Sequence, residues 1–305
     1  MTPPALSVIV CTHNPRREYL ERALAGLAAQ TLPRDRWELV LVDNASNSPV
    51  VSWFDASRAP QPRLISEPQL GLTHARLRGV RETSGDVIVF VDDDNVLAAD
   101  YLEQADAIGR EWPRLGTWGG QTLPEWEATP APWTKRYWNW IGVRELDRDL
   151  WSNLRNDMRS APFGAGMCVR RHVAETYAQV VSGDELRRSL GRTGTQLIGS
   201  EDSDLAFTSC DLGLGNGIFC RLKLTHIIPR QRLQEKYLLK LVESLTYSNT
   251  LLMLAHGVAA PIPSRAQRFL QFYQSLFIAQ RARRFDRARA RGRSRAWRIA
   301  GERQP

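Results

Sequence analysis

The stretch Asp86-Val-Ile-Val-Phe-Val-Asp-Asp-Asp94 joins a buried-strand pattern to three consecutive carboxylates. The apolar run from Val87 to Val91 predicts a buried strand that brings Asp92 to Asp94 to its carboxyl end. Neighbouring carboxylates repel one another unless a cation offsets their charge. Mg²⁺ and Mn²⁺ prefer one or two protein carboxylates together with phosphate oxygens, so this junction predicts a divalent ion between the protein and a diphosphate. The alternative is an Asp-rich turn that caps the next helix.

Three similar strand patterns precede this one, at residues 6–11, 37–42 and 63–66. The first ends in Thr12-His-Asn14 and the second ends in Asp43. Buried strands that alternate with helices are typical of a parallel α/β sheet, where ligands lie beyond the carboxyl ends of the strands. No glycine-rich fingerprint follows the first strand, which counts against a dinucleotide-binding domain or a P-loop. The pattern favours a nucleotide site of another kind.

Six short motifs follow one another along residues 6 to about 230. They are Ser7-Val-Ile-Val-Cys-Thr-His-Asn14, Leu41-Val-Asp-Asn-Ala-Ser46, Gly71-Leu-Thr-His-Ala-Arg76, Gly85-Asp-Val-Ile-Val-Phe-Val-Asp-Asp-Asp94, Phe163-Gly-Ala-Gly-Met167 and Gly199-Ser-Glu-Asp-Ser-Asp-Leu205. In order and spacing they resemble the glycosyltransferase family 2 enzymes of the GT-A fold. The resemblance implies an α/β fold in which a Rossmann-like, mostly parallel sheet is flanked by helices, with a C-terminal helical extension. It also implies an inverting, non-processive enzyme of bacterial type.

The resemblance implies particular contacts for a nucleotide sugar and a metal. Residues expected around the nucleotide sugar are Thr12, Asn14, Asp43, Arg76, Asp92 and Asp93. Residues expected to hold the metal, Mn²⁺ or Mg²⁺, are Asp92, Asp94 and His226. A histidine in an apolar setting is as readily structural. Arg230, four residues further on, is a candidate for phosphate oxygens or an ordinary surface residue.

Sugar transfer needs a stabilised leaving group and a deprotonated acceptor hydroxyl. A metal ion supplies the first requirement as a Lewis acid, and a positioned carboxylate supplies the second as a general base. The acidic motif at residues 200–205 is the best source of that base, and we assign it to Asp202, with Glu201 as an acceptor contact or orienting neighbour. Asp204 is expected to cap or pair at the surface. The alternative is an acidic helix N-terminus that only favours the helix dipole.

The acceptor side is predicted between the strand end and the base. Six of the ten tryptophans lie between residues 116 and 162, and Trp118 is a candidate platform for a sugar ring. The alternative is that most of these tryptophans belong to the core. Gly164 and Gly166 offer close backbone approach to an acceptor or donor sugar.

The four cysteines show no paired spacing, which favours reduced thiols and a cytoplasmic protein. A peripheral location at the inner face of the membrane is the alternative. No signal peptide and no run of transmembrane length is recognised. We expect a GT-A catalytic domain at residues 1–230, with a nucleotide-sugar half at 1–115 and an acceptor half at 116–230. A helical extension is expected at 231–280 and a flexible basic tail at 281–305.

The positive charge is concentrated near the C-terminus. From Pro261 onward there are twelve arginines and two carboxylates, a net charge of +10, whereas the whole chain carries +8 and residues 1–260 therefore −2. Apolar residues at helical spacing lie at 269–278, just before most of these arginines. An apolar stripe beside a basic face favours an anionic membrane surface. The alternatives are a helix at 264–280 packed on the catalytic domain and nonspecific nucleic-acid binding.

The expected partners are a nucleoside-diphosphate sugar, most readily a UDP-sugar, and a glycan or lipid-linked acceptor; no specific nucleic acid is expected. Two other function classes remain open. A sugar-nucleotide nucleotidyltransferase would need a glycine-rich loop with a basic residue, which residues 11–15 lack. A non-catalytic binding protein of the same fold would tend to lose one of the acids of the site. All five acids are present, namely Asp43, Asp92, Asp94, Glu201 and Asp202. Processive synthases carry Gln-x-x-Arg-Trp, whereas the tryptophan is missing after Gln231-Arg232.

Overall fold

The computed structural model describes residues 4–55, 61–155, 157–258, 264, 266–267 and 279–302. The apolar residues 269–278 and most of the segment 264–280, for which packing or membrane contact was predicted, lie outside this described part. None of the described helices combines the length and the apolar character that crossing a membrane requires.

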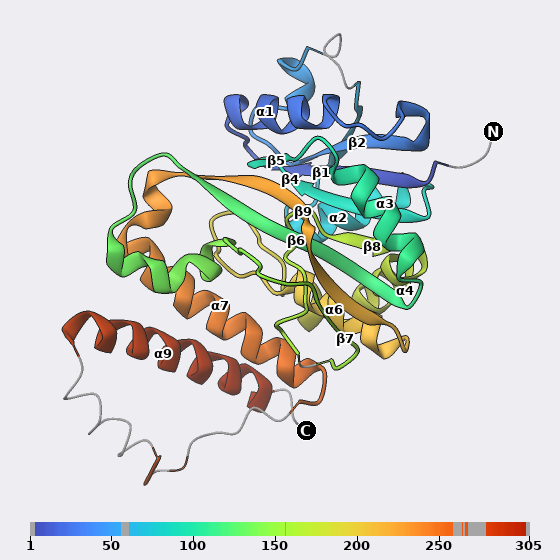
Figure 1. The fold of residues 1–305 in the computed structure, drawn as a ribbon. Helices are drawn as coiled ribbons and strands as arrows, with labels where there is room; N and C mark the ends of the chain where they lie inside the picture. Colours follow the sequence, from blue (N-terminus) through green and yellow to red (C-terminus); the bar gives the residue numbers. More distant parts are fainter. Residues whose placement is uncertain are drawn as a thin grey trace.

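Within the described residues a single nine-stranded sheet forms the centre of the molecule (Figure 1). Its order is β3-β2-β1-β4-β8-β6-β9-β5, and β7 pairs with β9. The strands are β1 (Leu6–Thr12), β2 (Trp37–Asn44), β3 (Arg63–Glu67), β4 (Val87–Asp92), β5 (Asn95–Leu97), β6 (Leu115–Trp126), β7 (Leu150–Ser152), β8 (Cys168–Arg170) and β9 (Gly215–Ile228). Strands β1 to β4 pair in parallel, as predicted, while β8 joins β4 to β6 through antiparallel pairing.

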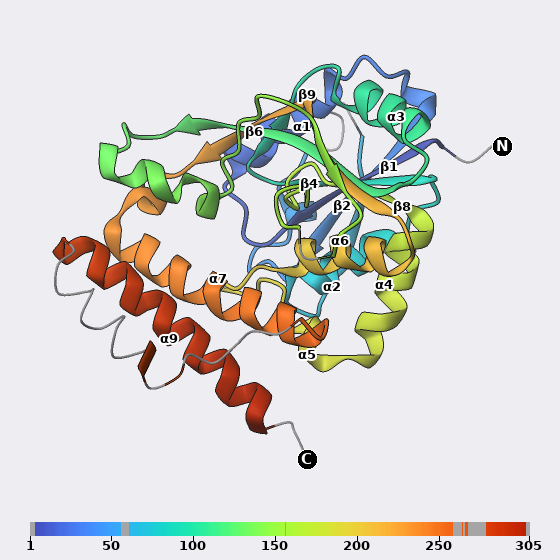
Figure 2. The ribbon, with the colours of Figure 1, turned by 60° about the horizontal axis from the view of Figure 1, so that its bottom comes forward.

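Helices cover both faces of this sheet, which confirms the predicted α/β fold. They are α1 (Arg17–Ala28), α2 (Leu72–Arg81), α3 (Tyr101–Glu111), α4 (Arg171–Gly183), α5 (Glu185–Arg188), α6 (Glu201–Asp211), α7 (Glu235–Ala255) and α9 (Gln280–Glu302). Short 3₁₀ segments are η1 (Arg34–Arg36), η2 (Val50–Ser52), η3 (Pro132–Ile141) and η4 (Arg230–Leu233). Helices α1 and α3 lie on one face, and α2, α4 and α6 lie on the other (Figure 2).

The two-sided burial follows from the alternation of side chains along a strand. In β1, Val8 and Val10 pack with α1 and α3, whereas Ile9 packs with α2 on the opposite face. Because both faces are covered, the strand is apolar without interruption from Val8 to Cys11 instead of alternating with polar residues. Helix α2 lies very close to β1, since a Cβ built at Gly79 would come within 2.4 Å of the Ile9 side chain.

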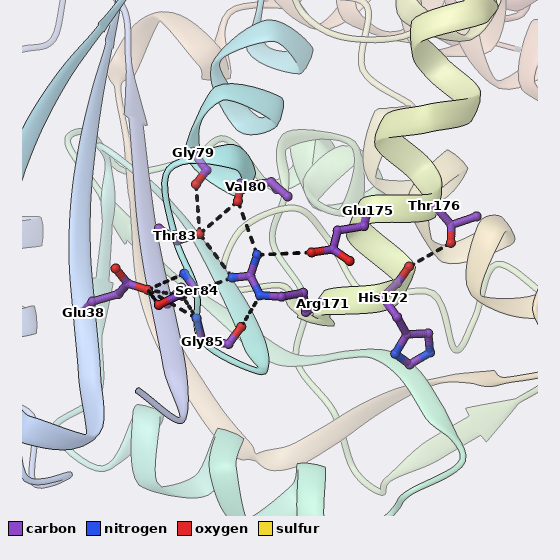
Figure 3. Close-up of polar contacts among 11 residues, drawn as sticks. Glu38, Gly79, Val80, Thr83, Ser84, Gly85, Arg171, His172, Glu175 and Thr176 are labelled. Carbon is purple, nitrogen blue, oxygen red and sulfur yellow. Dashed lines mark hydrogen bonds and ion pairs between the residues drawn. The ribbon is translucent and has the colours of Figure 1, made fainter. Parts of the chain in front are cut away.

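A network of polar contacts fixes the amino end of β4, at the edge opposite the three aspartates (Figure 3). Arg171, the first residue of α4, donates to the carbonyl oxygens of Gly85 at 2.6 Å and Val80 at 3.3 Å. Glu38 of β2 accepts hydrogen bonds from the backbone N–H and the hydroxyl of Ser84. These contacts join α2, β2, β4 and α4, so they anchor the strand whose other end carries the aspartates.

The Glu38 carboxyl gives this network a pH dependence. Burial raises its pKa, but the hydrogen bonds from Ser84, Ser7 and Gly85 outweigh burial and leave the pKa below its ordinary value. A carboxyl with a lowered pKa in the folded state contributes stability above its unfolded pKa of about 4.5, and this contribution is lost as pH falls through the folded value.

Glu38→Gln should therefore lower the urea midpoint of unfolding at pH 7 by removing the charged acceptor. The difference from the wild type should shrink as pH falls below about 4.5, because the wild-type carboxyl then protonates in both states. Glu145→Gln, at an exposed carboxyl, is the matched control and should change little. A difference that stays constant from pH 7 to below 4 would contradict this account of Glu38.

The C-terminal region differs from the expectation of a flexible basic tail at 281–305. Residues 280–302 form the helix α9, which runs along α7 in both views (Figures 1 and 2). Phe285, Ala288 and Ala296 are buried, and the Phe285 ring lies 4.1 Å from the ring of Tyr137 in η3. The prediction was wrong because it relied on the charge of the segment. Apolar residues at helical spacing lie between the arginines, and they form a buried face of the helix.

Candidate active site

A cavity of about 580 Å³ lies at the carboxyl ends of β1 and β4. Its walls come from the strand ends, from η3, from the loop before α6 and from α7, which contributes residues between 237 and 249. The expected helical extension therefore closes the site instead of lying beside it. The predicted residues that line this cavity are Thr12, Arg76, Asp92, Asp93, Asp94, Gly164, Glu201, Asp202 and His226.

Arg76 is the buried cation at the centre of the site. Its Nη2 lies 3.4 Å from Asp92 Oδ1, and its Nη1 lies 3.4 Å from Glu201 Oε1. Burial lowers the pKa of the guanidinium, but the two carboxylates outweigh burial and raise it, so Arg76 stays charged. One buried guanidinium thus joins the end of β4 to the start of α6.

Glu201 is buried beside this cation. Burial raises the pKa of its carboxyl to about 7, although Arg76 opposes the shift and Asp202 adds to it. Its Oε1 faces Arg76, and its Oε2 has no hydrogen-bond partner among the described residues. Glu201 is therefore suited to position the Arg76 guanidinium. Its neighbour Asp202 also lines the cavity but accepts hydrogen bonds from backbone N–H groups.

Asp94 is buried against two basic side chains. The register that pairs Asn95 of β5 with His226 of β9 brings the imidazole to Asp94. His226 Nε2 lies 3.4 Å from Asp94 Oδ2, and Arg232 Nη2 lies 3.0 Å from the same oxygen. Burial raises the pKa of Asp94, but His226 and Arg232 outweigh it and hold the pKa far below its ordinary value. Asp94 is an anion in this setting.

The third aspartate of the strand end has a different environment. Asp93 accepts a hydrogen bond from the Thr12 hydroxyl. Burial raises the pKa of the Asp93 carboxyl to about 7, with the Asp94 charge adding to the shift. The three consecutive aspartates are thus divided among Arg76, Thr12 and the pair of His226 with Arg232.

The predicted metal ligands come together only in part. Within the described residues no three His, Cys, Asp or Glu side chains converge as a metal site. Asp94 and His226 do converge, whereas Asp92 lies beside Arg76. A carboxylate and an imidazole form a partial donor set for Mn²⁺ or Mg²⁺, whose shell is commonly completed by phosphate oxygens and water. These two residues fit such an ion, next to the Arg232 guanidinium.

Asp202 is held rigidly at the start of α6. Its Oδ2 accepts a hydrogen bond of 2.9 Å from the Gly164 N–H, and its Oδ1 accepts one of 2.6 Å from the Ser203 N–H. Gly164 leaves no room for a side chain, since a Cβ there would lie 2.5 Å from Arg76 Nη2. The cavity thus has a carboxylate that two backbone N–H groups hold in place.

Two residues predicted around the nucleoside do not line the cavity. Asp43 Oδ2 accepts a hydrogen bond of 2.7 Å from the Val50 N–H. Asn14 Oδ1 accepts one of 2.8 Å from the Asn47 N–H, with Asn14 itself at a positive φ of 50°. Both side chains shape the loops after β1 and β2, and a role of either in nucleoside binding stays a prediction.

Two residues predicted on the acceptor side lie in the core. Trp118 is fully buried and packs on Gly109, so the prediction of a sugar platform was wrong for this residue. Its position in the middle of the β6 run, not in a loop, explains the burial. Gly166 has a φ of +72°, and a Cβ there would lie 2.4 Å from the Tyr101 hydroxyl, so it serves close packing.

Several residues of the site were not found from the sequence. Arg230, the candidate for phosphate oxygens, is exposed. Arg232, and not Arg230, lies beside the acids of the site, where it pairs with Asp94. Asp204 is fully buried against Arg187 and His256, so the expectation of a surface carboxylate was wrong. No local signal distinguished these arginines from surface ones. Other cavity residues that the motifs did not indicate are Asn139, Trp140, Arg144, Arg192, Tyr237 and Asn249.

Comparison with known families agrees with this geometry. The model of the family described as Glycosyl transferase family 2 matches residues 7–165, about half of the chain. The chain belongs to glycosyl transferase family 2. The matched residues carry β1 to β4 and the acidic strand end, and the base candidate Asp202 lies beyond them.

Curated relatives of this family 2 member are distant and match it over part of their length. An N-acetylglucosaminyltransferase of Bradyrhizobium diazoefficiens is 27% identical over 169 residues, which are 54% of this chain and 33% of that protein. Glycosyltransferase AglE of Haloferax volcanii is 29% identical over 106 residues, which are 34% of each chain. The chain thus matches about a third of the length of these relatives.

Solved structures support the fold. The mannosyltransferase PcManGT from Pyrobaculum calidifontis, in complex with GDP-Man and Mn²⁺, has a TM-score of 0.56 at 18% identity and covers 100% of this chain and 77% of its own. TarS of S. aureus, residues 1–349 in complex with UDP-GlcNAc, has a TM-score of 0.52 at 15% identity and covers 93% and 79%. These neighbours and the family match show that the family 2 member has the GT-A fold.

Proposed function

We propose that the chain is an inverting glycosyltransferase that moves a sugar from a nucleoside-diphosphate sugar to a hydroxyl group, with Asp202 as the general base. The observation that carries this proposal is the fixed Asp202 carboxylate in the same cavity as the acidic strand end. A base on one side and a diphosphate site on the other are what a direct displacement at the anomeric carbon needs.

The donor side is proposed at the strand end. Arg232 and Arg192, both on the cavity wall, are suited to phosphate oxygens. Asp92 and Asp93 are proposed to contact the nucleotide sugar. A UDP-sugar is the preferred donor, since TarS is named with UDP-GlcNAc and relatives are named N-acetylglucosaminyltransferases. The mannosyltransferase neighbour is named with GDP-Man, so a GDP-sugar is the donor to test beside it.

A divalent ion is proposed at Asp94 and His226, and Mn²⁺ is the ion named for the mannosyltransferase neighbour. When bound, such an ion neutralises the charge of the leaving diphosphate as a Lewis acid. Arg232 forms hydrogen bonds to both Asp94 and His226, so it holds the two proposed ligands together. The same guanidinium would be close to phosphate oxygens of a bound diphosphate.

Asp94→Asn should abolish the Mn²⁺ dependence of nucleotide binding measured by isothermal titration calorimetry, because it removes the charge that would bind the ion. Asp106→Asn is a matched control, since Asp106 pairs with Arg36 and Arg110 and does not line the cavity. Unchanged Mn²⁺-dependent affinity in the Asp94 variant would rule out this ion site.

Asp202→Asn should lower kcat by about 10²–10⁴-fold while leaving donor affinity nearly unchanged, because the amide keeps the shape but cannot accept the proton. The measurement is nucleotide release with acceptor present, combined with calorimetric binding of the donor. Glu185→Gln, an exposed acid in the nearby α5, serves as the control. Full turnover in Asp202→Asn would remove this residue from the proton-transfer role.

The two other function classes predict different products from a nucleotide sugar. A nucleotidyltransferase would bring a nucleoside triphosphate to the site, and a non-catalytic binding protein would release no nucleotide. A donor screen with UDP-, GDP- and dTDP-sugars distinguishes the three, since only the transferase releases nucleoside diphosphate. The catalytic domain is proposed to span residues 1–230 together with α7, which lines the cavity.

We also propose an acceptor held at an anionic membrane, at the cytoplasmic face, through α9. The apolar face of α9 packs on α7, so this contact would be electrostatic and not an insertion. Arg283, Arg287 and Arg298 lie on the opposite face of the helix by their spacing. None of the three has a carboxylate within 4 Å in the described part of the chain.

Replacing Arg283, Arg287 and Arg298 together by Glu should weaken sedimentation with phosphatidylglycerol-containing vesicles, with little change in binding to phosphatidylcholine vesicles. The thermal melt should stay nearly constant, because these side chains point away from α7. The same three changes at exposed Arg110, Arg114 and Arg148 serve as the charge-matched control. Equal vesicle binding by the two triple variants would contradict a membrane role for α9.

A further inference from the structure

The arginines on the cavity wall are not equally neutralised. Arg76 is paired with Asp92 and Glu201, and Arg232 is paired with Asp94. Arg144 lines the same cavity but has no carboxylate within 4 Å in the part of the chain that the structure describes. The cavity thus contains a guanidinium without an anionic partner.

The surroundings of Arg144 hold the guanidinium in place without neutralising it. Its Nη1 donates a hydrogen bond of 2.8 Å to the Ala161 carbonyl oxygen. Its Cζ lies 3.7 Å from the centroid of the Phe163 ring, so the planar group stacks on the aromatic face. A guanidinium has five N–H donors, so most of them are left for a ligand.

The charge on Arg144 is uncompensated by its neighbours. Burial lowers the pKa of the guanidinium to about 10, and Asp202 opposes this shift only through its more distant charge. Removing a cation from water without a paired anion is costly, and a structure retains such a group mainly where a ligand compensates it. The stacked, partly buried Arg144 therefore has the properties of a site for an anion.

The backbone places this cation next to the proposed base. Phe163 carries the stacked guanidinium, and the next residue, Gly164, donates its N–H to Asp202. Arg192, the other cavity arginine without an ion pair in the described residues, lowers the pKa values of both Asp94 and Glu201, and we have proposed it for the donor phosphates. Arg144 instead belongs to the side of the attacking hydroxyl.

We propose that the acceptor carries an anionic group, a phosphate or a carboxylate, which Arg144 binds next to the hydroxyl that Asp202 deprotonates. This inference rests on the proposed glycosyltransferase function. A planar guanidinium that stacks on Phe163 presents paired N–H donors to two oxygens of such a group. The bound anion would fix the position and orientation of the acceptor, so that one hydroxyl lies within reach of Asp202.

The competing explanation is a purely structural role. Residue 144 pairs through its backbone with Thr122, and its side chain ties this bridge to the Ala161 carbonyl. A structural role predicts that replacing Arg144 changes activity toward all acceptors alike. A role in binding predicts that the change depends on the charge of the acceptor.

The test uses matched acceptor pairs that differ in one charge. Glycerol 3-phosphate is compared with glycerol, and methyl glucuronide with methyl glucoside, in binding by saturation-transfer NMR in the presence of UDP and in acceptor-stimulated nucleotide release. We expect the wild type to favour at least one anionic member by about tenfold or more in kcat/KM, the usual worth of a charge-assisted hydrogen bond. Which pair shows the preference distinguishes a phosphate from a carboxylate.

Arg144→Gln should bring that ratio close to one, and Arg144→Lys, which keeps the charge but not the planar donors, should retain part of it. Arg148→Gln, at an exposed arginine of the same segment, is the matched control and should keep the full ratio. Equal use of charged and neutral probes by the wild type, binding of neither anionic probe, or an unchanged ratio in Arg144→Gln would overturn the inference. Calorimetric binding of UDP- and GDP-sugars is recorded separately, and its absence from the wild type would contradict the proposed function itself.

Discussion

The site depends on the balance between five clustered carboxylates and two buried guanidinium groups. Burial of acids without compensation would force protons onto them, and one buried cation can hold only its nearest partners as anions. Arg76 pairs with Asp92 and Glu201, although burial still raises the pKa of Glu201 to about 7, whereas Arg232 and His226 keep Asp94 an anion. The cavity therefore contains two ion clusters, one around Arg76 and one around Asp94. We propose that the diphosphate of the donor binds at the cluster around Asp94.

The fold supplies this balance through pairings that are distant in the chain. The parallel pairing of β1 with β4 brings Thr12 to the acidic strand end, and the pairing of β5 with β9 brings His226 to Asp94. The Gly164 N–H, 38 residues away in the chain, holds Asp202 in the same cavity. Contacts between segments that are distant in the chain, more than any local motif, thus determine which acid meets which cation.

The sequence predicted the parallel half of the sheet and most of the acidic residues of the cavity, because strand patterns and clustered charges are local features. It did not predict the partners of those acids. Arg144 and Arg232 look like surface arginines until tertiary contacts partly bury them, and Trp118 looks like a loop aromatic although it belongs to the buried first half of a long strand. Helix α9 was missed because arginines mask the small apolar residues, such as Ala288, that pack on α7. Burial and pairing at long range are what the sequence alone does not specify.

The most direct measurement for the central claim is a crystal structure of the protein with Mn²⁺ and a nucleoside diphosphate, in which anomalous scattering locates the metal. The account predicts Mn²⁺ at Asp94 and His226, with phosphate oxygens beside it and the Arg232 guanidinium turned from Asp94 toward them. Arg76 should keep its contacts with Asp92 and Glu201. A diphosphate bound away from Asp94, with the pair of Asp94 and Arg232 intact, would contradict the account.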